Sequence, residues 1–242
     1  MIRGLIGKKI GMTQIFNKDG NFIPVTVVEA GPCMILELKE SPKKIKLGFE
    51  PIKESKLDKP KNGFFKKVGV TPMRIVREVT STDNSQYKVG QELKADFFKT
   101  GDCVDVQGTS IGKGFQGGMK RHGWSGGGAT HGSMHHRRVG SIGSSAFPSR
   151  PFKGRTMPGH MGQEVVTVQG LRVVDINVEK NLLFIKGAIP GHERGTVLIK
   201  RSLKKPFKDL DAKIEVVAKK INPLKQSKKA AGGGKPAAKG GK

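Results

Sequence analysis

Short apolar runs separated by turn residues recur along the first two hundred positions of the chain. Residues 12–16 and 22–28 flank a turn sequence at 17–20, and this arrangement predicts a β-hairpin. Residues 45–49 alternate between apolar and polar, as in a half-buried strand. The same criteria predict further strands at residues 33–38, 73–79, 102–109, 165–176, 182–185 and 197–199, and a short helix at residues 59–68.

Many short strands and few helices predict a mainly β protein with a small closed β-barrel. We expect the barrel in two halves, residues 1–105 and 164–217, which flank a long irregular segment at 106–163. Residues 41–99, where prolines interrupt the strand pattern, are expected to form an α+β insertion on the side of the barrel. Residues 218–242 consist largely of Lys, Gly and Ala, which predicts a basic disordered tail.

The segment at residues 106–163, called the arm below, differs in composition from its surroundings. It contains no Asp or Glu, eight Lys or Arg, fifteen Gly and five of the six histidines of the chain. With only four branched aliphatic residues it cannot offset the roughly 1 to 2 kcal/mol per residue lost on ordering a backbone, so it should be disordered alone. A flexible solvated loop is the simplest alternative, but such loops normally mix both charge signs. An acid-free segment favours contact with polyphosphate instead.

The charge of the whole chain points to the same kind of partner. It carries 45 Lys and Arg against 20 Asp and Glu, and this net charge of +25 indicates a polyanionic partner. A membrane surface is the rival polyanion, but the sequence has neither a basic amphipathic helix nor an apolar run of about 18 residues. We therefore predict nucleic acid and no membrane. Cys33 and Cys103 lie far apart in predicted strands, which predicts two unpaired, small apolar side chains in a reducing cytoplasm.

One glycine motif in the arm is suggestive of a nucleotide site. Residues 112–117 match G-x-G-x-x-G, but a dinucleotide site needs a helix that begins there and an acid about twenty residues later. Gly118, Gly123 and the glycines at 126–128 oppose a helix, and the arm has no acid. Residues 108–114 also do not match a P-loop, because the spacing between their glycines is one residue too short and Gly114 stands where Ser or Thr would hold magnesium. We expect no cofactor.

The arm histidines leave several functions open. Zinc sites usually recruit Cys or carboxylates on a fixed scaffold, and neither cysteine is near, so no metal is expected. An RNA-processing enzyme would use a pair such as His131 and His135, although glycine supplies few rigid elements. A histone-like DNA compactor is a third hypothesis, which the strand-rich pattern disfavours. RNA contact accounts best for the mixture, because imidazole and Trp124 stack on bases, Arg binds phosphate and Gly lets the backbone approach closely.

Several longer motifs carry a family resemblance. They are GLIGKKIGMTQ at 4–14, GKGFQG at 112–117, ATHG at 129–132, GSIG at 140–143, MPGHMG at 157–162, VTVQ at 166–169, NLL at 181–183 and KGAIPG at 186–191. Together, and in this order, they closely resemble the bacterial form of the universal ribosomal protein L3 family. The resemblance covers most of residues 1–202, whereas the Lys-Gly-Ala tail lies beyond it.

The resemblance implies a non-enzymatic, structural constituent of the large ribosomal subunit in the cytoplasm. It implies a barrel of the translation-protein type, direct binding of large-subunit rRNA, and a role early in subunit assembly. It also implies large-subunit neighbours numbered fourteen and nineteen, and an arm that extends towards the peptidyl transferase centre during translation. The implied arm tip is Ser144, Ser145, Ala146, Phe147 and Pro148. Some relatives carry an N-methylated glutamine where this chain has Ala146, so that modification should be absent.

Composition and resemblance together give one set of candidate rRNA-binding residues in the arm. They are Lys113, Lys120, Arg121, His122, Trp124, Thr130, His131, His135, His136, Arg137, Arg138, Arg150, Lys153, Arg155 and His160. Catalytic and metal-binding residues are not expected.

Overall fold

The computed structural model describes residues 2–16 and 20–205. The predicted tail at 218–242, the end of the second predicted barrel half and most of the predicted turn at 17–20 lie outside these residues. The described chain is mainly β, which confirms the predicted fold class at that level. The predicted hairpin is present, because its two strands pair in antiparallel register from Gly7 and Ala30 to Phe16 and Phe22.

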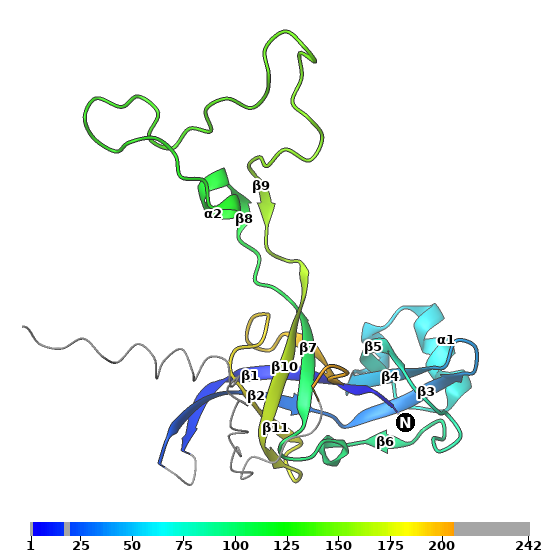
Figure 1. Ribbon diagram of the computed structural model, residues 1–242. Coiled ribbons are helices and arrows are strands. Elements are labelled where there is room, and N and C mark those ends of the chain that lie inside the picture. Colours follow the sequence, from blue (N-terminus) through cyan, green and yellow to red (C-terminus); the bar gives the residue numbers. More distant parts are fainter. Residues whose placement is uncertain (1, 17–19, 206–242) are drawn as a thin grey trace, which may run out of the picture. The chain divides into compact units, whose positions relative to one another are not determined.

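Six antiparallel strands pair in a closed ring, in the order β1-β12-β7-β10-β11-β2 with β2 paired back on β1 (Figure 1). They are β1 Gly4–Phe16, β2 Phe22–Ala30, β7 Cys103–Thr109, β10 Val165–Asn177, β11 Leu182–Lys186 and β12 Thr196–Arg201. The period-two pattern explains their placement. In β7, Val104, Val106 and Gly108 are buried, whereas the residues between them are only half-buried.

A second sheet of four antiparallel strands, called the side sheet below, has the order β5-β4-β3-β6. Its strands are β3 Cys33–Lys39, β4 Lys44–Pro51, β5 Met73–Thr80 and β6 Glu92–Leu93. The sequence places the start of the side insertion at residue 41, whereas β3 pairs with β4 and β6 in this sheet. Two short 3-10 helices, Glu54–Lys56 and Ala95–Phe97, complete the region.

The predicted helix is confirmed as α1, Lys59–Val68. A proline in its first turn suits a position whose N–H needs no partner, and Gly69 ends it in the left-handed conformation at φ 72°. The helix buries Phe65 against Leu36 and Met73 of the side sheet. A larger apolar cluster is common to the ring and the side sheet, so the two sheets share one core.

Lys8 of β1 and Glu50 of β4 form an ion pair of 3.0 Å that also links the ring to the side sheet. The cysteines are unpaired, as the sequence predicts. Cys33 is buried in β3 and donates to the carbonyl of Ile6, and Cys103 is half-buried in β7.

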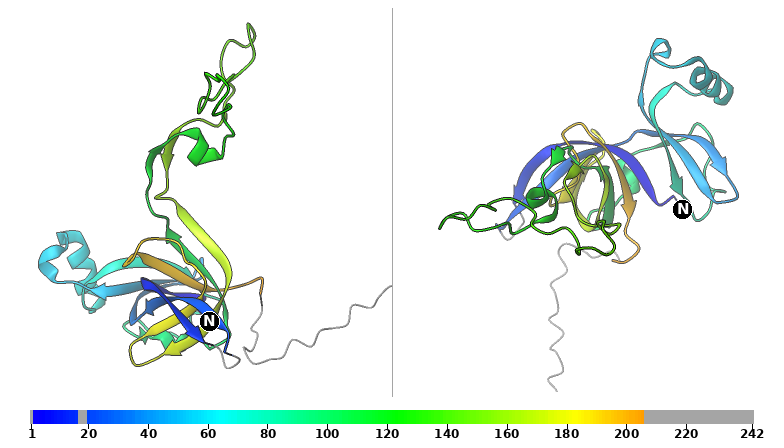
Figure 2. Two further views of the ribbon diagram at one scale, coloured as in Figure 1. Left: turned by 90° about the vertical axis from the view of Figure 1, so that its left-hand side faces the viewer. Right: turned by 90° about the horizontal axis from the view of Figure 1, so that it is seen from above.

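Residues 106–109, predicted to begin the arm, belong instead to ring strand β7, because they pair with β10 and β12. The rest of the arm leaves the ring at the end of β7 and returns at the start of β10 (Figures 1 and 2). It contains two short paired strands, β8 Gly114–Gln116 and β9 Gly159–Met161, and one short helix, α2 Gly118–His122. This helix corrects the prediction that glycines oppose a helix here. Gly117 precedes it in an extended conformation, and Gly123 ends it at φ 69°, where a side chain would be strained, so glycines stand at both ends of α2.

Candidate nucleic-acid interface

The base of the arm continues the pairing of β7 with β10. Ser110 N–H donates to the carbonyl of Glu164 at 2.8 Å, and Lys113 N–H donates to that of Met161 at 2.9 Å. β8 and β9 then pair directly. The two chains run so close that a Cβ on Gly162, at φ 79°, would lie 2.2 Å from the carbonyl oxygen of Ile111. The arm therefore starts as a two-stranded ribbon rather than as a free loop, and we call residues 110–116 and 159–164 the neck.

The helix α2 is tied to the returning chain through one carbonyl group. The Arg121 guanidinium donates to the oxygen of Met157 at 2.7 Å, and Nε2 of His122 lies 3.1 Å from the same oxygen. Because a carbonyl only accepts, that ring nitrogen carries the proton. Two of the candidate RNA-binding residues thus hold together parts of the arm that are 35 and 36 residues apart.

Trp124 completes this arrangement. Its indole N–H donates to the hydroxyl of Thr156 at 3.3 Å, and its ring stacks with His122 at a centroid distance of 6.2 Å. The ring also packs against buried Gly118, where a Cβ would lie 2.0 Å from it. We call Gly118, Arg121, His122, Trp124, Thr156 and Met157 the α2 cluster. It orders this part of the arm through hydrogen bonds and ring contacts instead of an apolar core.

Beyond the α2 cluster the chain forms a loop held by its own backbone. Gly127 N–H donates to the carbonyl of His136 at 3.0 Å, and Nδ1 of His136 lies 3.1 Å from the carbonyl of Gly128. Arg138 N–H donates to the carbonyl of His135. These bonds fold residues 126–138 back on themselves, and they leave the guanidinium groups of Arg137 and Arg138 exposed.

The outermost part of the arm contains the predicted tip. The Arg155 guanidinium donates to the carbonyl of Ser141 at 3.0 Å, which closes the loop that carries residues 144–148. Within that loop, the Ser149 hydroxyl donates to the carbonyl of Ala146. Phe147 is 89% exposed, so the tip presents an aromatic ring that nothing in the described chain covers.

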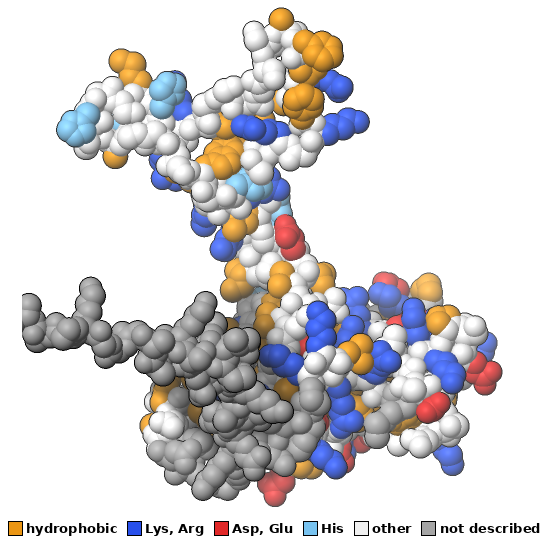
Figure 3. Space-filling model, in the orientation of Figure 1, with side chains coloured by type: hydrophobic (Ala, Val, Ile, Leu, Met, Phe, Trp, Pro, Cys, Tyr) orange, Lys and Arg blue, Asp and Glu red, His pale blue; other side chains and the backbone are white. Residues whose placement is uncertain are grey.

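The candidate residues are placed where a polyanion can reach them. Thirteen of the fifteen are exposed, and Arg121 and Trp124 of the α2 cluster are half-buried. Figure 3 shows Lys, Arg and His side chains along the arm, with an acid only at its base. Among the ion pairs of the described residues, none involves an arm cation. Their charge therefore lacks a counterion in this part of the chain.

The sequence reasoning missed three exposed apolar residues of the arm. Phe115, Met134 and Phe152 are 75%, 83% and 65% exposed. The two phenylalanine rings are of the kind that stacks on unpaired bases, and the signal was present in the sequence, since each of the three residues lies within a few positions of a cation. Next to the neck, a hollow of about 600 Å³ brings Lys113, Arg121 and other polar side chains together.

Within residues 2–16 and 20–205, no three His, Cys, Asp or Glu side chains are grouped as a metal site would require. No helix in the described part of the chain is long and apolar enough to span a membrane.

Comparisons with known proteins decide the family. The family described as Ribosomal protein L3 matches residues 61–181. The large ribosomal subunit protein uL3 of Heliobacterium modesticaldum is 53% identical over 206 residues, which cover 84% of this chain and 98% of the relative. The uL3 protein of Syntrophotalea carbinolica is 52% identical, over 84% of this chain and 100% of the relative. That of Brachyspira pilosicoli is 48% identical, over 85% of this chain and 96% of the relative.

The chain belongs to the ribosomal protein L3 family. The resemblance predicted from the motifs is confirmed. As a member of the L3 family, the chain is a structural ribosomal protein and not an enzyme, so the hypothesis of an RNA-processing enzyme built on His131 and His135 is wrong. Its partners are those of an L3 protein, large-subunit rRNA and other ribosomal proteins, and its place is the ribosome in the cytoplasm.

Proposed function

We propose that this chain binds large-subunit rRNA directly through the arm, acts early in subunit assembly, and extends residues 144–148 towards the peptidyl transferase centre. The ring serves as a barrel of the translation-protein type, in two halves at 1–105 and 164–217, with the side sheet packed beside it. The neighbours are the large-subunit proteins numbered fourteen and nineteen. Residues 218–242 add a basic tail. Since Ala146 stands at the glutamine position, the tip functions without methylation there.

One observation carries this proposal. The arm holds eight Lys or Arg with no acid over 58 residues, and the described structure gives none of these cations an ionic partner. Each cation placed against a phosphate releases counterions, whereas a carboxylate in the same gap would be repelled. Glycines keep the backbone thin, so that it fits between RNA helices, and the exposed aromatic rings supply stacking surfaces.

The salt dependence of rRNA binding tests the role of the arm. Arg137→Ala combined with Arg138→Ala removes two exposed charges from the arm. As the control, Lys67→Ala combined with Lys88→Ala removes two exposed charges outside the arm. Each lost phosphate contact should lower the slope of log K against log salt by about 0.7 to 0.9. We expect a smaller slope for the arm variant and an unchanged slope for the control. Equal losses in both variants, or equal affinity for duplex DNA, would contradict specific binding through the arm.

Deletion of residues 144–148 tests the role of the tip. The deletion leaves the neck and the α2 cluster intact, so the shortened chain should still sediment with the large subunit through a high-salt gradient. We expect slower peptide transfer by the purified subunits, or a delay in their assembly. Subunits that assemble and react at the normal rate would contradict the placement of the tip near the catalytic centre.

A further inference from the structure

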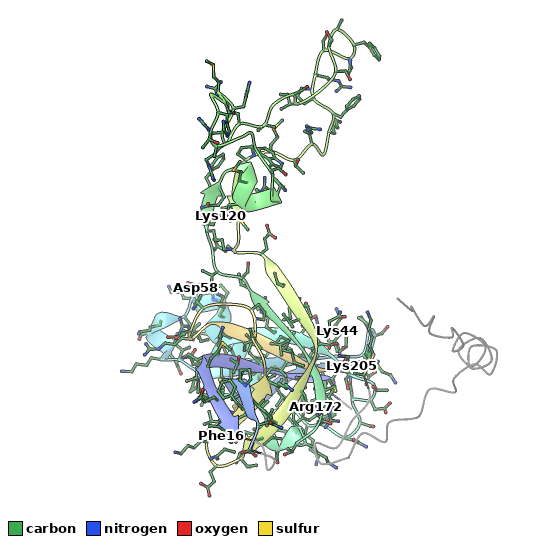
Figure 4. All side chains as sticks on the ribbon, turned by 60° about the vertical axis from the view of Figure 1, so that its left-hand side comes forward. Phe16, Lys44, Asp58, Lys120, Arg172 and Lys205 are labelled. Atoms are coloured by element: carbon green, nitrogen blue, oxygen red, sulfur yellow. The ribbon has the colours of Figure 1, made fainter. Side chains whose placement is uncertain are left out.

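The hairpin of β1 and β2 extends beyond the ring. β12 pairs with β1 only from Gly4 to Lys8, and β11 pairs with β2 only from Val25 to Glu29. Past these points, residues 11–13 of β1 keep only β2 as a strand partner, and residues 14–16 and 22–24 pair only with each other among the described strands (Figure 1). Among the described residues, the β1 edge of this outer hairpin is free, and its β2 edge is free except at Pro24, whose carbonyl accepts a hydrogen bond from Gly187 N–H. In Figure 4, the label Phe16 marks the region near the end of this hairpin.

The outer hairpin exposes large apolar side chains. Ile10, Met12, Phe16 and Phe22 are 46%, 55%, 66% and 55% exposed. Met12 and Phe16 lie on the same face, because they are four positions apart in a strand, and Phe22 is directly opposite Phe16. The two phenylalanine rings meet edge to face at 6.4 Å. Together the four side chains expose on the order of 400 Å² of apolar area, which matches the largest apolar patch of a typical monomer, about 300–600 Å², and such patches are often functional.

Charge distinguishes the outer hairpin from the arm. Apart from Lys18 and Asp19 in the predicted turn, which carry opposite charges, residues 10–28 contain no charged side chain, although the chain has 45 Lys and Arg and 20 Asp and Glu in 242 residues. A surface that lies on RNA needs cations to offset the phosphates. Depletion of charge with enrichment of Phe and Met is typical of the core of an interface between proteins. The favoured occupant is therefore an apolar protein surface rather than RNA.

We propose that the outer hairpin, residues 10–16 and 22–24, is a docking site for an uncharged, apolar surface of another large-subunit protein. This inference rests on the proposed function, which brings the chain among such proteins. A standard interface buries about 800 Å² per partner, so the patch supplies about half of it. The partner surface covers Met12, Phe16 and Phe22, and the free hairpin edges offer backbone groups to a strand of the same partner.

A photocrosslink made inside the assembled subunit tests the proposal. p-Benzoylphenylalanine replaces Phe16, on the apolar face, or Thr13, which is exposed on the opposite face of the same hairpin. The full-length chain is expressed in cells, large subunits are purified through a high-salt gradient, and the adducts are identified by mass spectrometry before and after RNase treatment. In parallel, Phe16→Lys is introduced, and the stoichiometry of each protein in the subunits is measured.

We expect one RNase-resistant adduct to a single ribosomal protein from position 16, at least about tenfold more abundant than from position 13. Occupancy of that same protein should fall in Phe16→Lys subunits. An RNase-sensitive adduct, an adduct to residues 206–242 of the same chain, equal yields at both positions, or unchanged occupancy would overturn the inference and leave the proposed function standing. A chain that does not enter large subunits at all would overturn both.

Discussion

Replacing Gly118 with Ala tests whether the α2 cluster exists in the free protein. The added Cβ would lie 2.0 Å from the indole ring of Trp124, far inside van der Waals contact. The ring must therefore move away, which breaks its hydrogen bond to Thr156 and its stack with His122. Gly117→Ala is the matched control, because nothing lies within 4 Å of a Cβ at that position.

The size of the effect follows from three contributions. Overpacking costs about 1–3 kcal/mol. Loss of one neutral hydrogen bond costs about 0.5–1.5 kcal/mol more. Alanine regains at most about 1 kcal/mol over glycine through its helix propensity. The net cost of about 0.5–3.5 kcal/mol raises the equilibrium constant for opening the α2 cluster roughly 2- to 400-fold.

Fluorescence measures this opening directly, because Trp124 is the only tryptophan of the chain. Acrylamide is the suitable quencher, since it is uncharged and a chain of net charge +25 does not concentrate it. In the free protein we expect Gly118→Ala to raise the quenching constant and shift the emission to the red, while Gly117→Ala behaves as the wild type. An unchanged quenching constant in Gly118→Ala would refute the packing of Trp124 on this glycine in solution.

Three further outcomes are expected. Gly4→Ala places a Cβ 2.1 Å from a backbone oxygen of β12 and should lower the free energy of unfolding, measured in urea, by about 2–3 kcal/mol. Gly11→Ala, which has nothing within 4 Å of its Cβ, should lower it by less than about 0.5 kcal/mol. Equal losses in the two variants would contradict the register of the ring. Burial raises the pKa of the Cys33 thiol to about 12, so iodoacetamide at pH 8 should alkylate half-buried Cys103 roughly tenfold faster, and comparable rates would contradict that burial. A hydrogen bond from Lys8 of β1 lowers the pKa of Glu50 in the folded protein. The stabilisation that this ion pair gives is therefore present above the ordinary carboxyl pKa and is lost as the pH falls through the lowered pKa. The difference in Tm between wild type and Glu50→Gln should accordingly shrink below about pH 4, and a constant difference would contradict the ion pair.

The elements that the sequence predicts correctly are those with local signals. The hairpin has a turn sequence between two apolar runs, and α1 has a proline in its first turn and a glycine after its end. Residues 102–109 alternate cleanly and form β7. In each case the signal, either the alternation of apolar and polar residues or the residue types at the ends of the element, lies within about a dozen residues. No distant contact is needed to interpret it.

Pairing partners and the α2 cluster depend on distant contacts, and the sequence could not specify them. β3 has the same apolar pattern as the ring strands, yet it pairs with β4 and β6. In α2, the local cost of glycine in a helix is about 1 kcal/mol per residue, which argues against a helix. The bonds from Arg121 and His122 to Met157, across 35 or more positions, offset that cost.

In the proposed binding of rRNA by the arm, the α2 cluster lowers the free energy that ordering the arm would cost. A wholly disordered arm of 58 residues would lose roughly 1 to 2 kcal/mol per residue on ordering, and that loss would consume much of the gain from its cations. Here the neck strands and the α2 cluster already fix both chains of the inner arm. Only the loops that carry Arg137, Arg138 and the tip still need to adapt to RNA. Glycines therefore help to order the arm, since Gly118 and Gly162 allow the close contacts that fix its inner part.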